Sequence, residues 1–153
     1  MRRIVISDVD GCLTDGKFVY TADGKVAKIY GAHDNDGVKK LKKLGYDVVF
    51  ISADKRGFPI TKKRIEDMKC EITQVSEEER LEWVKNKIAD YEWSAFFGDG
   101  ISDIPAGTHV NLFGCPANAR KEVKEVAAFT TESKGGEGAF LDFALEIINR
   151  NND

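Results

Sequence analysis

The feature that most constrains the fold is an apolar, β-type run that ends in two carboxylates. Residues 4–6 read Ile-Val-Ile, and Asp8 and Asp10 follow within four residues. Carboxylates this close repel each other unless a cation lies between them, so a buried strand gains no stability from ending this way. Carboxylate oxygens suit Mg²⁺, which usually takes only one or two of them from a protein. The pair therefore indicates a metal site and a reaction, although an acidic turn after an edge strand would give the same pattern.

Two later apolar runs also end in polar side chains. Residues 48–51 read Val-Val-Phe-Ile, a continuous run of the kind that buried parallel strands show, and Ser52 follows it. Residues 94–97 lead into a second acidic pair, Asp99 and Asp103. The predicted core strands thus end in a hydroxyl or in carboxylates.

Helical patterns lie between these strands. A helix over residues 38–44 is expected to stop at Gly45, and Pro59 opens a second helix that reaches residue 68. A short strand at residues 72–75 comes before Ser-Glu-Glu-Glu at 76–79, a capping box that predicts a third helix. This alternation predicts right-handed βαβ units, and so an α/β, Rossmann-like, doubly wound parallel sheet with helices on both faces.

The polar strand ends are expected to meet in space. In a doubly wound fold, ligands bind outside the carboxyl ends of the strands, so residues far apart in the sequence converge there. Chance could place one acid at a strand end, but two acidic pairs and a hydroxyl on three strand ends indicate a catalytic site. The candidate site comprises Asp8, Asp10, Ser52, Asp99 and Asp103.

The motifs around these residues resemble those of the haloacid dehalogenase-like phosphatases. They are Asp-Val-Asp-Gly at 8–11, Thr-Asp-Gly at 14–16, Ser52 and Gly-Asp-Gly-Ile-Ser-Asp at 98–103. The resemblance covers nearly the whole chain, and the first and last motifs are the specific ones. It points to the small branch without a cap domain, which contains the 3-deoxy-manno-octulosonate 8-phosphate and nonulosonate 9-phosphate phosphatases.

The resemblance implies a role for each acidic residue. Asp8 would attack phosphorus and form an aspartyl-phosphate that water then hydrolyses. Asp10 would protonate the leaving oxygen and later take a proton from the attacking water. Mg²⁺ would be bound by the side chains of Asp8 and Asp99 and by the backbone carbonyl of Asp10, with Asp103 supporting the metal shell.

Substrate contacts are also implied by the resemblance. Ser52 would donate a hydrogen bond to a phosphate oxygen, and Gly11 belongs to the loop that meets the phosphate. Asp54 and Lys55 follow the second strand end and are placed either to meet the substrate beyond its phosphate or to form a surface pair.

The chain departs from the family pattern at one catalytic position. The pattern has a lysine on or just before the helix that follows the third strand, and the nearest basic residue here is Arg80. Arginine binds phosphate bidentately but is not a simple replacement for a compact ammonium. Arg80 is expected either to offset phosphate charge or to be an ion-pair partner on a charged helix surface.

One small insertion is expected, a β-hairpin over about residues 17–31 with its turn at 21–24. Without a cap domain, the site must be covered by a macromolecular substrate or by a neighbouring subunit. The resembled branch implies a homotetramer, in which the hairpin and the glycine-rich residues 135–138 help to close an adjacent site. The glycines are equally explained as a plain loop and helix cap.

Composition bounds the remaining possibilities. With 153 residues, 42% of them hydrophobic, the chain is expected to form one domain, residues 1–153. A net charge of −3 argues against nucleic acid as a partner, since such binding usually shows a basic stripe. No apolar run approaches the roughly 18 residues of a membrane-spanning helix. Three cysteines without a secretory signal favour a reducing, cytoplasmic location.

These observations predict a Mg²⁺-dependent phosphomonoesterase that acts on a small sugar-acid phosphate. The alternative is a weakly active or inactive oligomerisation module, related to the phosphatase domain of sugar-nucleotide synthetases. A phospho-accepting receiver domain is disfavoured, because its acceptor would be expected at a middle strand, where this chain has Ser52 or Gln74.

Overall fold

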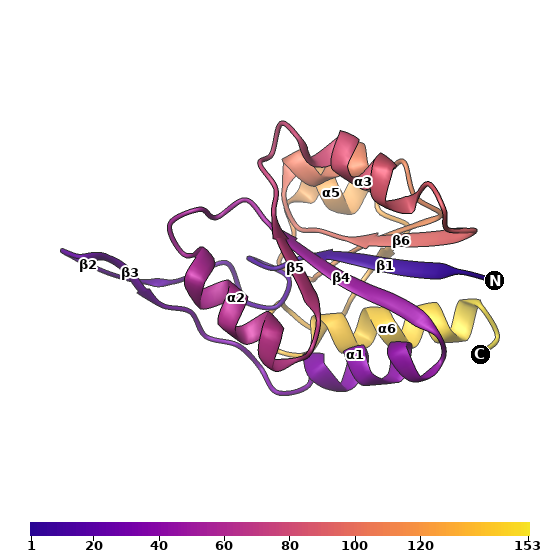
Figure 1. Cartoon of the computed structure of the whole chain (residues 1–153), viewed down its shortest axis with the longest axis horizontal. Coiled ribbons are helices and arrows are strands. Elements are labelled where there is room, and N and C mark those ends of the chain that lie inside the picture. The colour runs from indigo at the N-terminus through magenta and orange to yellow at the C-terminus, as the bar shows by residue number, and fades with distance from the viewer.

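A six-stranded sheet forms the centre of the molecule (Figure 1), and the computed structural model describes residues 1–153. The strand order is β5-β4-β1-β6-β7-β8, and each pairing is parallel. The chain moves outward from β1 to β5 and then returns to the other side of β1, which confirms the predicted doubly wound, Rossmann-like fold. In chain order the strands are β1 (Arg3–Asp8), β4 (Tyr46–Ser52), β5 (Glu71–Gln74), β6 (Trp93–Phe97), β7 (Leu112–Cys115) and β8 (Phe129–Thr130).

Helices cover both faces of this sheet. Figure 1 shows α1 and α6 below the sheet and α3 and α5 above it. Residues of α1, α2 and α6 share one buried cluster, and residues of α3, α4 and α5 share the other. The helices are α1 (Asp34–Lys43), α2 (Phe58–Asp67), α3 (Arg80–Ile88), α4 (Ile104–Gly107), α5 (Lys121–Val126) and α6 (Ala139–Arg150), with a 3₁₀ turn at Ile101–Asp103.

The central strand β1 is buried on both faces, which explains its uniformly apolar sequence. Ile4 and Ile6 pack toward α3 and α5, whereas Val5 packs toward α1 and α6. On the α6 side, the ring of Phe97 in β6 stacks on Phe143 with centroids 4.7 Å apart and meets Phe140 edge-on. These contacts hold the strand end from which Asp99 follows.

The predicted hairpin is present and extends past the carboxyl ends of the sheet strands (Figure 1). It consists of β2 (Val19–Thr21) and β3 (Gly24–Ala27), paired antiparallel. Its large apolar side chains are unusually open to solvent, because Phe18 is 45%, Tyr20 is 59% and Ile29 is 78% exposed. The hairpin is therefore the one inserted element that stands over the edge of the sheet where the acidic residues lie.

Two strands, β7 and β8, carry no signal that the sequence analysis used. Gly114 interrupts the apolar pattern of β7, and a β-carbon there would lie 2.3 Å from the ring of Phe143. The absence of a side chain at Gly114 thus lets an aromatic ring from α6 pack against the backbone of β7. β8 contains only two residues, too few to show a period.

The start of α3 also differs from expectation. The Ser76 hydroxyl accepts the Glu79 backbone N–H at 3.2 Å, as in a capping box, and donates to the Glu79 carboxylate at 2.7 Å. These bonds close a single turn, and the regular helix begins at Arg80. Arg80 consequently lies at the N-terminal end of α3, pointing toward the carboxyl ends of the strands.

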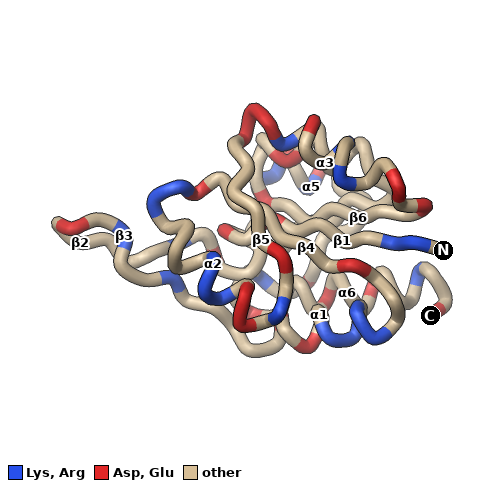
Figure 2. Tube along the Cα trace, in the orientation of Figure 1, with Lys and Arg blue, Asp and Glu red and all other residues tan.

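Charged residues of both signs are distributed over the helices (Figure 2). The lysines at 39–40 and 42–43 of α1 and at 62–63 of α2 are exposed. Arg64 is partly buried, and its guanidinium donates to the Gly31 carbonyl at 3.1 Å. None of the helices has both the length and the apolar character that a membrane crossing requires.

Candidate active site

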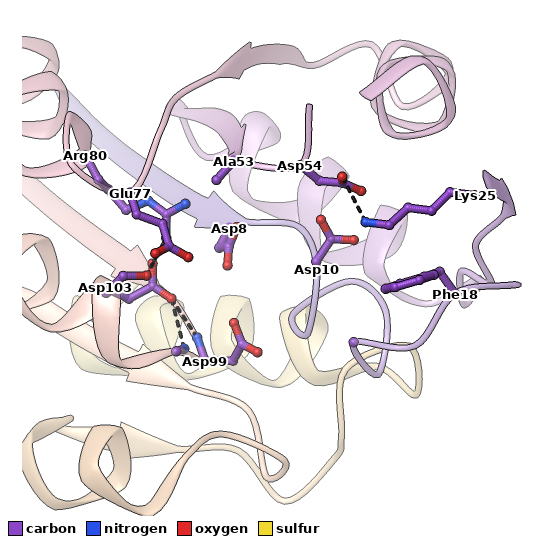
Figure 3. A pocket seen from close by; sticks show the side chains of 13 residues that line it. Asp8, Asp10, Phe18, Lys25, Ala53, Asp54, Glu77, Arg80, Asp99 and Asp103 are labelled. Atoms are coloured by element: carbon purple, nitrogen blue, oxygen red, sulfur yellow. Dashed lines mark hydrogen bonds and ion pairs between the residues drawn. The ribbon is translucent and has the colours of Figure 1, made fainter. Parts of the chain in front are cut away.

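A cavity of about 400 Å³ opens at the carboxyl ends of β1, β4 and β6 (Figure 3). Carboxylates predominate in its lining, six against one lysine and one arginine. Such a concentration of negative charge can admit a phosphate dianion only when cations offset it. The lining residues are Asp8, Asp10, Gly16, Phe18, Lys25, Ala53, Asp54, Glu77, Arg80, Asp99, Gly100, Ser102 and Asp103.

The carboxylates of Asp8 and Asp99 lie close together in this cavity. Burial, together with the charge of Asp103, raises the pKa of Asp8 well above its usual value and raises the pKa of Asp99 to about 6. An oxygen of each lies within 4.8 Å of the other and of the Cys12 sulfur. Burial also raises the pKa of the Cys12 thiol, which stays protonated and leaves the two carboxylates as ligands. This donor set fits a hard divalent cation such as Mg²⁺.

Asp103 connects the loop that carries Asp99 to Arg80. Its Oδ2 accepts the backbone N–H groups of Asp99 and Gly100, both at 3.0 Å, and its Oδ1 accepts from the Arg80 guanidinium. Asp103 is 1% exposed and Arg80 is 3% exposed, so this is a buried ion pair. Arg80 thereby reaches the cavity from α3, with Glu77 beside it (Figure 3). The alternative of a surface ion pair for Arg80 is wrong.

Asp10 lies on the other side of Asp8 (Figure 3), and both of its carboxylate oxygens have partners. The Ser52 hydroxyl donates to Oδ2 at 3.3 Å, and the ammonium of Lys28 lies 2.8 Å from Oδ1. Lys28 follows β3 and was not among the candidates from sequence, because nothing in the short hairpin segment marks one of its three lysines as buried.

Of the remaining predicted residues, Asp54 lies at the cavity, whereas Gly11 and Lys55 are not among the residues that line it. Gly11 has φ +85°, and a β-carbon there would lie 1.9 Å from the Asp99 carboxylate, so only glycine lets the two loops approach. Asp54 lines the cavity. Lys55 is exposed and outside it, because the chain turns back after Asp54, whose Oδ1 accepts the Gly57 N–H at 3.1 Å.

Comparison with known proteins assigns this architecture. The 3-deoxy-D-manno-octulosonate 8-phosphate phosphatase KdsC of Haemophilus influenzae is 30% identical over 150 residues, which cover 95% of this chain and 82% of that enzyme. The chain belongs to the KdsC-like phosphatases of the haloacid dehalogenase superfamily. The predicted resemblance and the predicted enzyme class, a phosphoric monoester hydrolase, are thereby confirmed. No family model matches the chain.

The solved structures agree with this KdsC-like assignment. The cobalt-bound form of the Haemophilus influenzae phosphatase has a TM-score of 0.89 at 28% identity, covering 99% of this chain and 90% of that one. N-acylneuraminate cytidylyltransferase A of Danio rerio is 25% identical over 158 residues, which cover 95% of this chain but 35% of that protein. The same domain thus recurs inside a larger synthetase.

One residue behind the first motif loop, Asn118, was not found from sequence, and it connects that loop to Gly135 of the predicted glycine-rich segment. The Asn118 amide donates to the Gly11 carbonyl at 2.9 Å and accepts the Gly135 N–H at 2.7 Å. A β-carbon on Gly135 would lie 2.1 Å from the Thr14 carbonyl. Gly135 therefore packs on the first motif loop of its own chain, and Gly138, at φ +101°, begins α6 as a helix cap.

The charge of this site predicts a pH-dependent stabilisation by Mg²⁺. The raised pKa of Asp99 means that the folded protein binds this proton more tightly than the unfolded chain does. The protonated Asp99 carboxyl therefore stabilises the fold below about pH 4, and this contribution is lost as the pH rises through about 6. Mg²⁺ competes with protons for the same carboxylates, so millimolar Mg²⁺ should raise the melting temperature clearly at about pH 7.5 and little at about pH 5.

Thermal unfolding with and without Mg²⁺ at the two pH values measures this effect. Asp99→Asn should abolish the Mg²⁺ response, whereas Asp23→Asn, an exposed carboxylate on the hairpin turn, should keep it. An equal shift at both pH values, or a shift that survives in Asp99→Asn, would contradict the assignment.

Proposed function

We propose that this chain hydrolyses the phosphate monoester of a sugar acid, of the octulosonate 8-phosphate or nonulosonate 9-phosphate type, with Mg²⁺ as cofactor. The observation that carries the proposal is the meeting of Asp8, Asp10, Asp99 and Arg80 in one cavity of a KdsC-like chain. The substrate class is taken from the name of the Haemophilus influenzae relative, which is a 3-deoxy-D-manno-octulosonate 8-phosphate phosphatase.

Asp8 is the nucleophile of the proposed reaction. Its Oδ1 accepts the Val9 backbone N–H at 2.9 Å, which fixes the carboxylate and leaves Oδ2 to attack phosphorus. The new bond from Oδ2 to phosphorus replaces the bond to the sugar oxygen, and water later attacks the aspartyl-phosphate. The side chains of Asp8 and Asp99 and the Asp10 carbonyl would hold Mg²⁺, which would supply positive charge for the phosphoryl group.

Asp10 and Arg80 share the remaining chemistry. Asp10 gives a proton to the sugar oxygen as the phosphorus–oxygen bond breaks and takes one from water in the second step. The Arg80 guanidinium, fixed by Asp103, offsets the charge of the phosphoryl oxygens. Ser52, whose hydroxyl lies 3.3 Å from Asp10 Oδ2, donates to a phosphate oxygen when substrate is bound.

Replacement of the nucleophile tests the function directly. Asp8→Asn should keep the fold but lower turnover at least ~10³-fold, since binding and electrostatics alone remain. The measurement is phosphate release from a panel of sugar phosphates, with and without Mg²⁺, next to a circular dichroism spectrum. Substantial activity of the folded variant, or wild-type activity after thorough chelation, would refute the proposed reaction.

Arg80 should prove essential in the same assay. Arg80→Ala removes one charge-stabilising donor and should lower kcat by ~10² or more, whereas Arg80→Lys should retain much of the activity. Lys85→Ala serves as the control, because Lys85 lies further along α3 and pairs with Glu82 at 3.6 Å. The opposite pattern, an active Arg80→Ala and an inactive Lys85→Ala, would move the role to Lys85.

The second candidate function is a weakly active oligomerisation module. It is suggested by the Danio rerio cytidylyltransferase, of which the chain matches only 35%. The complete set of Asp8, Asp10 and Asp99 favours the enzyme, since an oligomerisation module needs no buried carboxylates at its strand ends. Turnover of a chromogenic phosphate ester with added Mg²⁺ distinguishes the two.

We infer further that the chain assembles as a homotetramer through its hairpin. Phe18, Tyr20, Val26 and Ile29 are between 45% and 78% exposed, and Phe18 also lines the cavity. An apolar surface of this kind is typical of an interaction site, and a second copy that covers it would also close the cavity from the hairpin side.

Light scattering should therefore give the mass of four chains at micromolar concentration. Tyr20→Glu should yield smaller species, because a charge in the buried contact is costly. Asp23→Asn, at the exposed turn of the same hairpin, should leave the mass unchanged. A fully active monomer would defeat the tetramer and would favour a macromolecular phosphate as substrate.

A further inference from the structure

Lys28 is a buried lysine that the reaction described above does not use. Its side chain is 0% exposed, although it lies beside a hairpin whose large apolar side chains face solvent. The ammonium lies 2.8 Å from Asp10 Oδ1, 2.8 Å from Asp54 Oδ2 and 2.9 Å from the Thr61 hydroxyl. The Thr61 hydroxyl accepts a hydrogen bond and the two carboxylates lie at ion-pair distance, so the charge of the ammonium is compensated.

Each partner of Lys28 comes from a different segment. Asp10 follows β1, Asp54 follows β4, and Thr61 lies in α2 and is itself buried. Burial alone would lower the pKa of Lys28, but the bonds to Asp10 and Asp54 raise it above its usual value, so the side chain is charged. A buried charge is costly without partners, and this arrangement supplies all of them.

The contacts of Asp54 favour a role in fixing Lys28 over a role in binding substrate. Its Oδ1 lies 2.9 Å from the ammonium of Lys25 and accepts the Gly57 N–H at 3.1 Å, while its Oδ2 faces Lys28. Both oxygens are thus occupied by partners from the hairpin and from its own loop. The result is a chain of ion pairs that runs from the hairpin through Asp54 to Lys28 and ends on Asp10 (Figure 3 shows its Lys25–Asp54 part).

We infer that Lys28 is the positioning residue of the general acid, an inference that rests on the proposed phosphatase reaction. The ammonium fixes Asp10 by Oδ1, so that Oδ2, which has only the 3.3 Å contact from Ser52, carries the proton to the leaving oxygen. As the phosphorus–oxygen bond breaks, its electron pair remains on the leaving oxygen and takes that proton. In the second step, water transfers a proton to the same Oδ2.

A purely structural ion pair would predict a different kinetic result. Loss of fold stability lowers the amount of active enzyme and so affects each substrate equally. Loss of a positioned general acid matters most when the leaving oxygen is strongly basic, because a weakly basic oxygen departs without a proton. The dependence of rate on the leaving group therefore separates the two roles.

The experiment compares kcat/KM for phenyl phosphate and 4-nitrophenyl phosphate, which differ in the basicity of the leaving oxygen. Lys28→Met keeps the length of the side chain and removes its charge. It should lower kcat/KM for phenyl phosphate by ~10-fold or more and that for 4-nitrophenyl phosphate by less than ~3-fold, on the scale of general acid catalysis. Wild-type hydrolysis of both esters tests the phosphatase reaction separately from the role of Lys28.

Three further substitutions keep the test decisive: Asp10→Asn, Lys63→Met and Asp54→Asn. In a double-mutant cycle, Lys28→Met combined with Asp10→Asn should lose no more on phenyl phosphate than Asp10→Asn alone, because both remove one function. Lys63→Met, which removes a lysine that pairs with Asp67 on the exposed face of α2, should match wild type. If Lys28→Met does not fold, Asp54→Asn can be used, because it removes one ion-pair partner of Lys28. It should also lower kcat/KM more for phenyl phosphate than for 4-nitrophenyl phosphate, but by a smaller factor.

An equal loss on both esters, additive losses in the cycle, or unchanged kinetics of folded Lys28→Met would each overturn the inference while leaving the phosphatase assignment intact. Inactivity of the wild-type protein on both esters and on sugar phosphates would instead refute the proposed function.

Discussion

The structure depends on the close approach of three carboxylates, Asp8, Asp99 and Asp103, at the ends of β1 and β6. Desolvation raises the pKa of all three, repulsion by Asp103 raises those of Asp8 and Asp99 further, and within the chain Arg80 supplies the one buried cation at their side of the cavity. A divalent cation and the guanidinium together can balance this charge when a phosphate dianion enters. A cation held by Asp8 and Asp99 would therefore also relieve the repulsion between them.

Compensation of charge also explains why arginine can occupy the position where the family pattern has lysine. Arg80 is buried and needs more than one partner for its several donors. Asp103 accepts from its guanidinium, while the same Asp103 accepts two backbone N–H groups of the loop that carries Asp99. The planar guanidinium is thus anchored on one side and still faces the cavity on the other. A lysine at this point would give one compact charge with fewer fixed directions.

Topology explains how much of this could be predicted from sequence. The carboxyl ends of parallel strands meet at one sheet edge, so apolar runs that end in Asp8, Ser52 and Asp99 predict a shared site without coordinates. Lys28 and Asn118 leave no such signal, since their partners are distant in sequence and their own surroundings are ordinary. β7 was missed because Gly114 interrupts its apolar run. The glycine is required by the close approach of Phe143 from α6, and such a tertiary contact leaves no periodic pattern in the sequence.

Lys28 also connects the hairpin to Asp10, the proposed proton-transfer residue, although nothing in the sequence links the two. The hairpin shows its apolar side chains to solvent at one end, while the segment that leaves it buries Lys28 against Asp10. Lys25 of β3 is tied to the same network through Asp54. Anything that holds the hairpin, including a second copy of the chain, would restrain the network and therefore the general acid. In a phosphatase without a cap domain, closure of the site and orientation of Asp10 would then depend on the same contact.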